Sequence, residues 1–250
     1  MLWPPSGPRV SRRGPVPWRR RPGPGSGEQT SDERRPAGWW AVPGILQSEM
    51  IAIVDYGLGN IESVKYALDR LGEAAVVTCG AADVAAAAGV ILPGVGAFPQ
   101  AMDNLRRLEL IEAVCQAAGS GRPFLGICLG LQLLFDESQE HGCHAGLGII
   151  RGTVERFPAG LTVPHMGWNQ LRQERRSALF EGIRDPDWFY FAHSYRVVPA
   201  DGGVVIGTTD YGGSYASAVQ KRQLFAVQFH PEKSGPTGLK MLDNFCRLCR

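Results

Sequence analysis

Hydrophobic and polar positions follow a pattern that predicts strands and helices in alternation. An unbroken apolar run leads from Met50 to Asp55, which is typical of a parallel strand covered on both faces. Apolar residues then recur at helical spacing from Ile61 to Leu71, between an N-cap at Asn60 and a stop at Gly72. The pattern continues with a strand at 74–78, a helix at 81–88 and a strand at 89–92. This alternation indicates a parallel sheet with crossover helices.

The second half of the chain changes in texture. Helices are expected at 100–107 and 108–118, then a strand at 124–127 and a helix to about 138. Short segments then predict more antiparallel strands, at 148–157, 165–171, 188–192, 203–209 and 217–220. A central strand at 224–229 and a helix at 237–248 close the chain. The predicted fold class is α/β: an open, mostly parallel sheet flanked by helices, with additional antiparallel strands in the C-terminal half.

Residues 1–49 show no such periodicity. They hold nine of the 18 prolines and eight arginines against four acids, so we expect a disordered extension. A secretory signal would need an apolar run of about 7–15 residues, and a transit peptide would need a helix that the prolines forbid. Our hypothesis is that Met50 is the working start, that residues 1–49 come from an upstream start codon, and that 50–250 form one domain.

The net charge of +2 for the whole chain is the sum of +4 on this extension and −2 on the rest. The remainder carries 18 basic and 20 acidic residues, a net charge of −2. A slightly acidic body offers no attraction for nucleic acid or a membrane surface, and no apolar stretch is long enough to span a bilayer. We therefore expect neither nucleic acid nor membrane as a partner.

No cofactor and no metal are expected either. Gly57 and Gly59 lack the third glycine of a dinucleotide-binding fingerprint. Cys246 and Cys249 have no second pair, and the His/Cys cluster at 141–144 lacks the two matched pairs that zinc sites usually have.

The strongest chemical signal is the sequence GICLGLQ at 126–132, between a predicted strand and a predicted helix. A Gly-x-Cys-x-Gly turn at such a junction is the cysteine form of the nucleophile elbow, in which Gly126 and Gly130 leave room for the tight turn. The elbow places Cys128 at a helix N-terminus, where the dipole favours the thiolate, and turns the N–H of Leu129 toward a developing oxyanion. A buried, inert cysteine beside a glycine remains the alternative.

A second signal follows the central strand, at His230-Pro231-Glu232. Pro231 keeps His230 out of the helical region, and residues two apart in an extended segment point to one side. The Glu232 carboxylate can then fix the His230 tautomer and leave the other ring nitrogen for a nucleophile. With Cys128, these residues predict a triad for acyl transfer.

The loop 93–98, PGVGAF, lies at the carboxyl end of the third predicted strand, where open α/β sheets place their ligands. Glycines on both sides of Val95 allow the backbone to approach a ligand or to turn an N–H toward an oxyanion. An ordinary strand-to-helix turn would have the same composition.

Together these motifs resemble the class I (triad) glutamine amidotransferases over residues 50–250. GICLGLQ and FHPEKS are similar to the nucleophile-elbow and His/Glu signatures of that family. Within it, DYGLGN, PGVGAF, PHMGWN and FAHSYR most resemble the glutaminase subunits of imidazole glycerol phosphate synthase, from histidine biosynthesis. The resemblance implies a flavodoxin-like fold.

The resemblance also implies hydrolysis of glutamine to glutamate and ammonia through a thioester. Cys128 would be the nucleophile, His230 the base and then the acid, and Glu232 the group that orients His230. The residues expected to hold the substrate and the oxyanion are Gly94, Val95, Gly96, Leu129, Gln132, Ser194 and Tyr195.

The ammonia would pass to a (β/α)₈ barrel synthase subunit that makes imidazole glycerol phosphate and AICAR. Such a barrel needs about 250 residues itself, so a heterodimer with a separate chain is expected. The resemblance places Asn60, Met166, Trp168 and Lys233 against that partner. A catalytic thiol argues for a reducing compartment, so the expected location is the cytoplasm.

Three other interpretations stay open. The chain could be a stand-alone γ-glutamyl-type cysteine hydrolase, or the glutaminase subunit of another amidotransferase; PHMGWN and Lys233 argue against the first. It could also be a scaffold with a dead site, against which the intact Cys128, His230 and Glu232 argue.

Overall fold

The computed structural model describes residues 49–250. The expectation of a disordered extension falls on residues 1–48, outside the described part. Among the described residues, no helix is both long enough and apolar enough to cross a membrane.

Five short strands form the parallel half of the sheet. They are β1 (Ile51–Val54), β2 (Ala75–Thr78), β3 (Gly89–Leu92), β4 (Phe124–Ile127) and β13 (Leu224–Val227). Their order is β2-β1-β3-β4-β13, and every neighbouring pair is parallel. All residues of β1, β3, β4 and β13 are buried, as their unbroken apolar runs predict.

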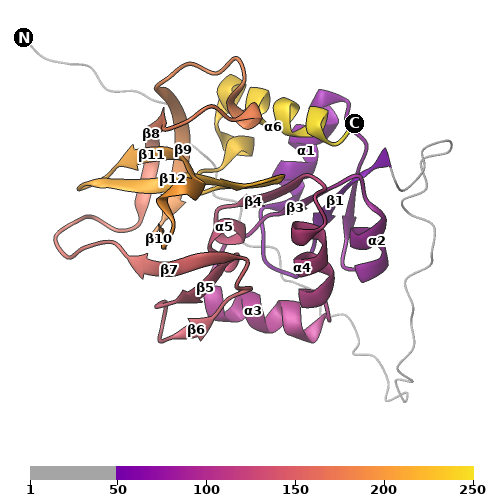
Figure 1. The fold of residues 1–250 in the computed structure, drawn as a ribbon, viewed down its shortest axis with the longest axis horizontal. Helices are drawn as coiled ribbons and strands as arrows, with labels where there is room; N and C mark the ends of the chain where they lie inside the picture. The colour runs from indigo at the N-terminus through magenta and orange to yellow at the C-terminus, as the bar shows by residue number, and fades with distance from the viewer. Residues whose placement is uncertain (1–48) are drawn as a thin grey trace, which may run out of the picture. The chain divides into compact units, whose positions relative to one another are not determined.

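Helices cover both faces of this half. Helices α1 (Ile61–Leu71) and α6 (Gly235–Leu248) lie on one face. Helices α2 (Ala81–Ala86), α3 (Phe98–Arg107) and α4 (Ile111–Gly119) lie on the other. Figure 1 has α1 and α6 above the strands and α3 and α4 below them. The two faces bury separate hydrophobic clusters, because successive side chains of each strand point to opposite sides. The predicted helix-flanked parallel sheet is confirmed.

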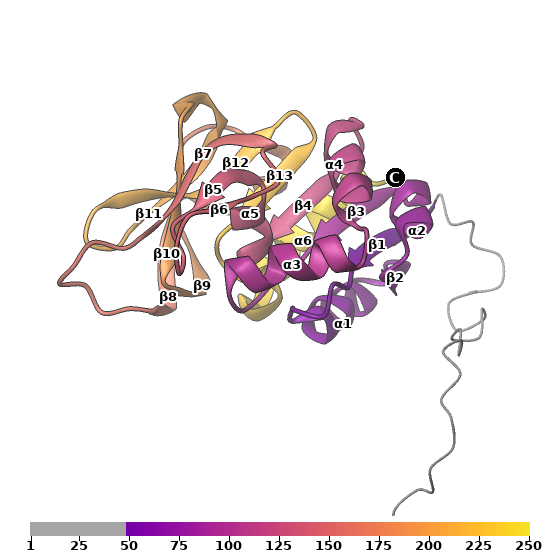
Figure 2. The same ribbon diagram turned by 90° about the horizontal axis from the view of Figure 1, so that it is seen from below.

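The second half of the sheet is mostly antiparallel. Beyond β13 come β12 (Ser214–Lys221), β10 (Tyr195–Pro199), β7 (Ile150–Arg156), β5 (Phe135–Ser138) and β6 (His144–Ala145). Only β5 and β7 pair in parallel here. Figure 2 shows these strands gathered on one side, away from α1 and α2.

Three further strands extend from β12 outside the main strand order. Strand β11 (Val205–Asp210) pairs with β12 and with β8 (His165–Gln173), and β8 forms a ladder with β9 (Asp187–His193). Short 3₁₀ helices lie at Ala178–Phe180, Gly202–Val204 and Pro231–Lys233. The predicted antiparallel strands are confirmed, and β10 is a further strand that the sequence did not predict.

The predicted helix after Cys128 is much shorter than expected. It is α5 (Leu129–Leu133), and the expectation that it runs to about residue 138 is wrong, because Phe135–Ser138 is strand β5. The apolar run after the elbow fits a buried helix and a buried strand equally well by periodicity. Pairing of Phe135 with Ile150 in β7 decides for the strand.

Candidate active site

Cys128 sits in a sharp turn between β4 and α5. Its backbone angles, φ 55° and ψ −107°, are ones that a residue with a side chain rarely adopts. A Cβ on Gly130 would lie 1.8 Å from the Leu92 carbonyl oxygen, and one on Gly126 would lie 2.9 Å from the Gly130 carbonyl oxygen. Both positions therefore exclude any side chain, as the elbow motif predicts.

His230 follows β13, and its ring is hydrogen-bonded to a carboxylate two residues away. The Nδ1 of His230 lies 2.8 Å from Oε1 of Glu232, and both side chains are buried. The segment is not extended throughout, as the sequence suggested: His230 is extended, but Pro231–Lys233 form a 3₁₀ turn. The fixed φ of Pro231 suits the first position of a helix, so the turn starts there and brings the carboxylate back to the ring.

Asn60, 172 positions earlier in the chain, binds the same carboxylate. Its Nδ2 donates to Oε1 of Glu232 at 2.9 Å, and its Oδ1 accepts from Ser63 Oγ at 2.7 Å. Asn60 is at the N-cap position of α1, yet its side chain makes no capping hydrogen bond, because it is engaged with Glu232. Among the described residues, nothing hydrogen-bonds to the buried Oε2 of Glu232.

The charges around His230 favour its protonated form. Burial lowers the pKa of His230, but the Cys128 sulfur and the Glu232 carboxylate, each also a hydrogen-bond partner of the ring, raise it to about 10. A thiol, an imidazole and a carboxylate thus lie in series. This is the arrangement used for covalent acyl transfer by cysteine.

A cavity of about 180 Å³ opens beside Cys128. Six of the seven residues expected to hold the substrate and the oxyanion line it: Val95, Gly96, Leu129, Gln132, Ser194 and Tyr195. The seventh, Gly94, does not line the cavity, and a Cβ there would lie 2.2 Å from Tyr56 Oη. The structure therefore gathers these residues from the loop between β3 and α3, from α5, and from Ser194 and the start of β10.

The N–H of Leu129 already has a partner. It donates to the carbonyl oxygen of Gly94 at 3.3 Å, so the group expected to meet an oxyanion is engaged within the protein. Gly96, two residues further on, has φ +104°, a value that glycine adopts without strain.

Three polar residues of this site were not predicted from the sequence: Glu140, His193 and Gln228. Glu140 lines the cavity, and its carboxylate accepts from the N–H of Phe98 at 2.8 Å. It lies in an acidic run with no distinguishing spacing. His193 and Gln228 carried weak signals, since they lie in FAHSYR and just before His230, at strand ends.

His193 is buried inside a hydrogen-bond network. Its Nδ1 lies 2.8 Å from the Tyr195 carbonyl oxygen, and its Nε2 lies 3.1 Å from Tyr215 Oη and 3.3 Å from His165 Nδ1. Burial lowers the pKa of His193 to about 3 and that of His165 to about 4. His193 is therefore neutral, and because a carbonyl can only accept, its proton is on Nδ1.

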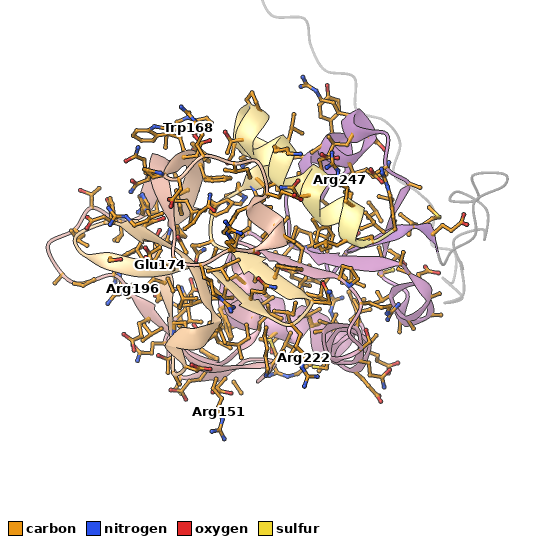
Figure 3. All side chains as sticks on the ribbon, turned by 45° about the horizontal axis from the view of Figure 1, so that its top comes forward. Arg151, Trp168, Glu174, Arg196, Arg222 and Arg247 are labelled. Carbon is orange, nitrogen blue, oxygen red and sulfur yellow. The ribbon has the colours of Figure 1, made fainter. Side chains whose placement is uncertain are left out.

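Three of the four residues expected at a partner surface are exposed. Met166 and Trp168 are 64% and 53% exposed on β8, and Lys233 is exposed beside His230. Trp168 projects from the edge of the molecule in Figure 3. Trp188, which the sequence did not single out, is 48% exposed on the neighbouring strand β9. Asn60 is instead turned toward Glu232.

All six cysteines are free thiols. The described residues contain no group of three or more His, Cys, Asp or Glu side chains that could hold a metal ion.

Comparison with known proteins identifies the class. A family model described as glutamine amidotransferase class-I matches residues 52–249. The chain therefore belongs to the class-I glutamine amidotransferases. The crystal structure of a glutamine amidotransferase has the same fold, with a TM-score of 0.63 at 22% identity over 79% of this chain and 98% of that one. PurLQS from Thermotoga maritima also has a TM-score of 0.63, at 17% identity over 80% and 99% of the two chains.

Curated relatives narrow the class. Imidazole glycerol phosphate synthase subunit HisH of Moorella thermoacetica is 56% identical over 200 residues, which cover 80% of this chain and 95% of the relative. HisH of Aquifex aeolicus is 50% identical over 196 residues, 78% and 95% of the two chains. HisH of Synechococcus elongatus is 51% identical over 205 residues, which cover 80% of this chain and 94% of the relative. Within its class, the chain groups with these HisH subunits.

Proposed function

We propose that this chain hydrolyses glutamine to glutamate and ammonia and supplies the ammonia to a second subunit, as part of imidazole glycerol phosphate synthase in histidine biosynthesis. One observation supports this chemistry most directly. Cys128, His230 and Glu232 interact in sequence, and the sulfur end of this chain of side chains lines a cavity of about 180 Å³. The family and the HisH relatives support glutamine as the substrate.

The reaction has two steps through a thioester. The sulfur of Cys128 attacks the carboxamide carbon of glutamine, and the carboxamide oxygen takes the negative charge. His230 then gives its proton to the carboxamide nitrogen, which leaves as ammonia. Water then attacks the thioester and His230 takes its proton. Glutamate leaves, and the sulfur regains its electron pair. Glu232 orients the ring and stabilises its charged form throughout.

The oxyanion would be held by the N–H of Leu129 and the backbone around Val95. These groups lie at the cavity beside the sulfur. The Leu129 N–H would have to exchange its partner, from the Gly94 carbonyl to the developing oxyanion.

The rest of the cavity would hold the substrate. Gly96, Gln132, Ser194 and Tyr195 surround it, and Glu140 adds a carboxylate to its wall. Free glutamine carries an α-ammonium group, and a carboxylate is its natural partner in a partly dry site. We assign that role to Glu140.

The partner would be a (β/α)₈ barrel chain that uses ammonia to make imidazole glycerol phosphate and AICAR, in a heterodimer with this one. The exposed apolar side chains Met166, Trp168 and Trp188, with Lys233 nearby, form a surface suited to a protein partner. On strand β9 of this surface, the Tyr190 carbonyl accepts a hydrogen bond of 2.8 Å from the backbone N–H of His230. A partner that docks there would therefore bind close to the triad. The cytoplasm is the expected location, because a thiol nucleophile needs a reducing compartment.

Replacing Cys128 with alanine tests the proposal. In the two-subunit enzyme, Cys128→Ala should abolish glutamine-dependent synthesis and spare synthesis driven by an added ammonium salt, because Cys128 only liberates ammonia. Both rates are measured on the same complex, with the unaltered enzyme as control. Loss of both activities would mean that Cys128 is structural, and full glutaminase activity would exclude it as nucleophile.

A further inference from the structure

Gln228 is a buried polar side chain that the proposed mechanism does not use. It follows β13, two residues before His230, and is 0% exposed. Its backbone N–H donates to the Ser217 carbonyl at 2.8 Å, which fixes the chain at this point. Its side-chain nitrogen, Nε2, lies 3.7 Å from the sulfur of Cys128. A buried amide beside a reacting sulfur raises the question of which end of the amide faces it.

The surrounding hydrogen bonds decide the orientation. The carbonyl oxygen of Tyr195 can only accept, and the nearest amide atom of Gln132, 3.1 Å away, must therefore be its nitrogen Nε2. The same nitrogen lies 3.2 Å from the side chain of Gln228. Because an amide nitrogen only donates, the atom of Gln228 that faces it must be the oxygen Oε1.

It follows that the NH₂ end of Gln228 points at Cys128. The opposite orientation would set two donors against each other at Gln132 and a carbonyl oxygen against the sulfur. Each would leave a buried polar group without a partner, at a cost of about 1–3 kcal/mol.

We propose that Gln228 is a further catalytic residue, whose amide N–H donates to the sulfur of Cys128 and stabilises its negative charge. Before attack, the bond favours the thiolate, which is the nucleophile. When water has added to the thioester, the carbon–sulfur bond breaks and its electron pair returns to sulfur, which again accepts the hydrogen bond from the same N–H. This inference rests on the proposed role of Cys128 as nucleophile.

The hydrogen bond from Gln228 stabilises the sulfur at stages of the reaction when His230 does not. His230 must move its proton to the leaving nitrogen during the first step, so it cannot keep stabilising the sulfur throughout. The amide of Gln228 holds its protons and acts as a fixed dipole, which costs no reorganisation when the charge appears.

The test compares Gln228→Met, which keeps the length of the side chain without a donor, with Gln228→Glu, which keeps an acceptor for Gln132 but turns a second oxygen to the sulfur. Alkylation of Cys128 by iodoacetamide is followed across a pH series and quantified on its own peptide. The exposed Cys79 and Cys143 in the same digest serve as internal controls.

We expect Gln228→Met to lower the alkylation rate at pH 7 by about tenfold and to move the half-maximal rate to higher pH, as for the loss of one hydrogen bond to a charged group. Gln228→Glu should lower it further, because a carboxylate repels the thiolate. Both variants should keep ammonium-driven synthesis in the two-subunit enzyme, which reports folding. A folded Gln228→Met with an unchanged alkylation profile would overturn the proposal.

A second measurement needs no substitution. In the unaltered protein, the side-chain amide protons of Gln228 should shift in NMR spectra when Cys128 is alkylated, and no shift would again overturn the proposal. Neither readout involves glutamine. Failure of the proposed function would appear instead as glutamine-dependent activity in Cys128→Ala, so the two failures are distinguishable.

Discussion

Glu232 is held by two donors at a single oxygen. Oε1 lies 2.8 Å from His230 Nδ1 and 2.9 Å from Asn60 Nδ2, on a side chain that is fully buried. Both bonds can form to any acceptor oxygen at this position, whereas stabilisation of the imidazolium needs the negative charge. Orientation and charge can therefore be separated by one substitution.

Glu232→Gln makes this separation. The glutamine oxygen can still accept from His230 and Asn60, so the ring should stay oriented while the charge is lost. We expect kcat for glutamine hydrolysis to fall by about 10²-fold, the lower end of the range for general acid–base assistance, because cysteine is intrinsically nucleophilic. Steady-state assays of the two-subunit enzyme measure the loss, with ammonium-driven synthesis as the control. An unchanged turnover number would remove Glu232 from the triad.

At the scale of elements, we propose that the loop between β3 and α3 controls whether an oxyanion can be bound. In the structure its Gly94 carbonyl accepts from the Leu129 N–H, and Gly96 lends the loop conformational freedom. We infer that two peptide orientations are open to this loop, one with a carbonyl and one with an N–H toward the sulfur. A partner can shift this equilibrium only by contacting one of them more favourably.

We expect the isolated chain to be a poor glutaminase for this reason. Loss of one oxyanion donor costs about 10²- to 10³-fold in rate, so partner binding should raise glutamine hydrolysis by up to that factor. The assay is glutamine hydrolysis by the chain alone, then with the synthase subunit, then with the nucleotide ligand of that subunit. Full activity of the lone chain would contradict the expectation and favour a stand-alone hydrolase.

For the molecule as a whole, two buried neutral histidines make stability depend on pH. Burial lowers the pKa of His193 to about 3 and that of His165 to about 4, while the unfolded chain titrates near 6.5. Between these values the unfolded state binds more protons, so the free energy of unfolding falls as the pH falls below about 6.5. His230, whose pKa is raised to about 10, acts in the opposite direction near and above pH 6.5, and at lower pH it is protonated in both states and adds no slope.

His193 alone should cost about 2 kcal/mol of stability between pH 6.5 and pH 5, and His165 acts in the same direction. Urea unfolding at a series of pH values measures this loss. His193→Asn places an amide donor where Nδ1 was and removes the titration, so its acid slope should be shallower than that of the unaltered protein. Tyr215, which contacts His193 through its hydroxyl, does not titrate in this range because burial raises its pKa. Equal slopes in the two proteins would exclude His193 as the source.

Much of the fold and the centre of the site follow from the sequence alone. The strands β1, β3 and β4 were predictable because unbroken apolar runs are a local property of the chain. The elbow at Cys128 was predictable because its glycines exclude side chains within a few residues of the turn. The proximity of Glu232 to His230 was predictable because the two are only two positions apart, although the 3₁₀ turn that joins them was not.

Tertiary structure alone decided the rest. Gln228 and Cys128 are 100 positions apart, and Asn60 and Glu232 are 172 apart. Their contacts exist because β13 lies beside β4 and because α1 packs against the segment after β13. Hydrophobic periodicity indicates that a segment is a buried strand, but it does not indicate which strand lies next to it. For the same reason the apolar run after Cys128 could not reveal that α5 ends at Leu133, since only pairing with β7 turns Phe135–Ser138 into a strand.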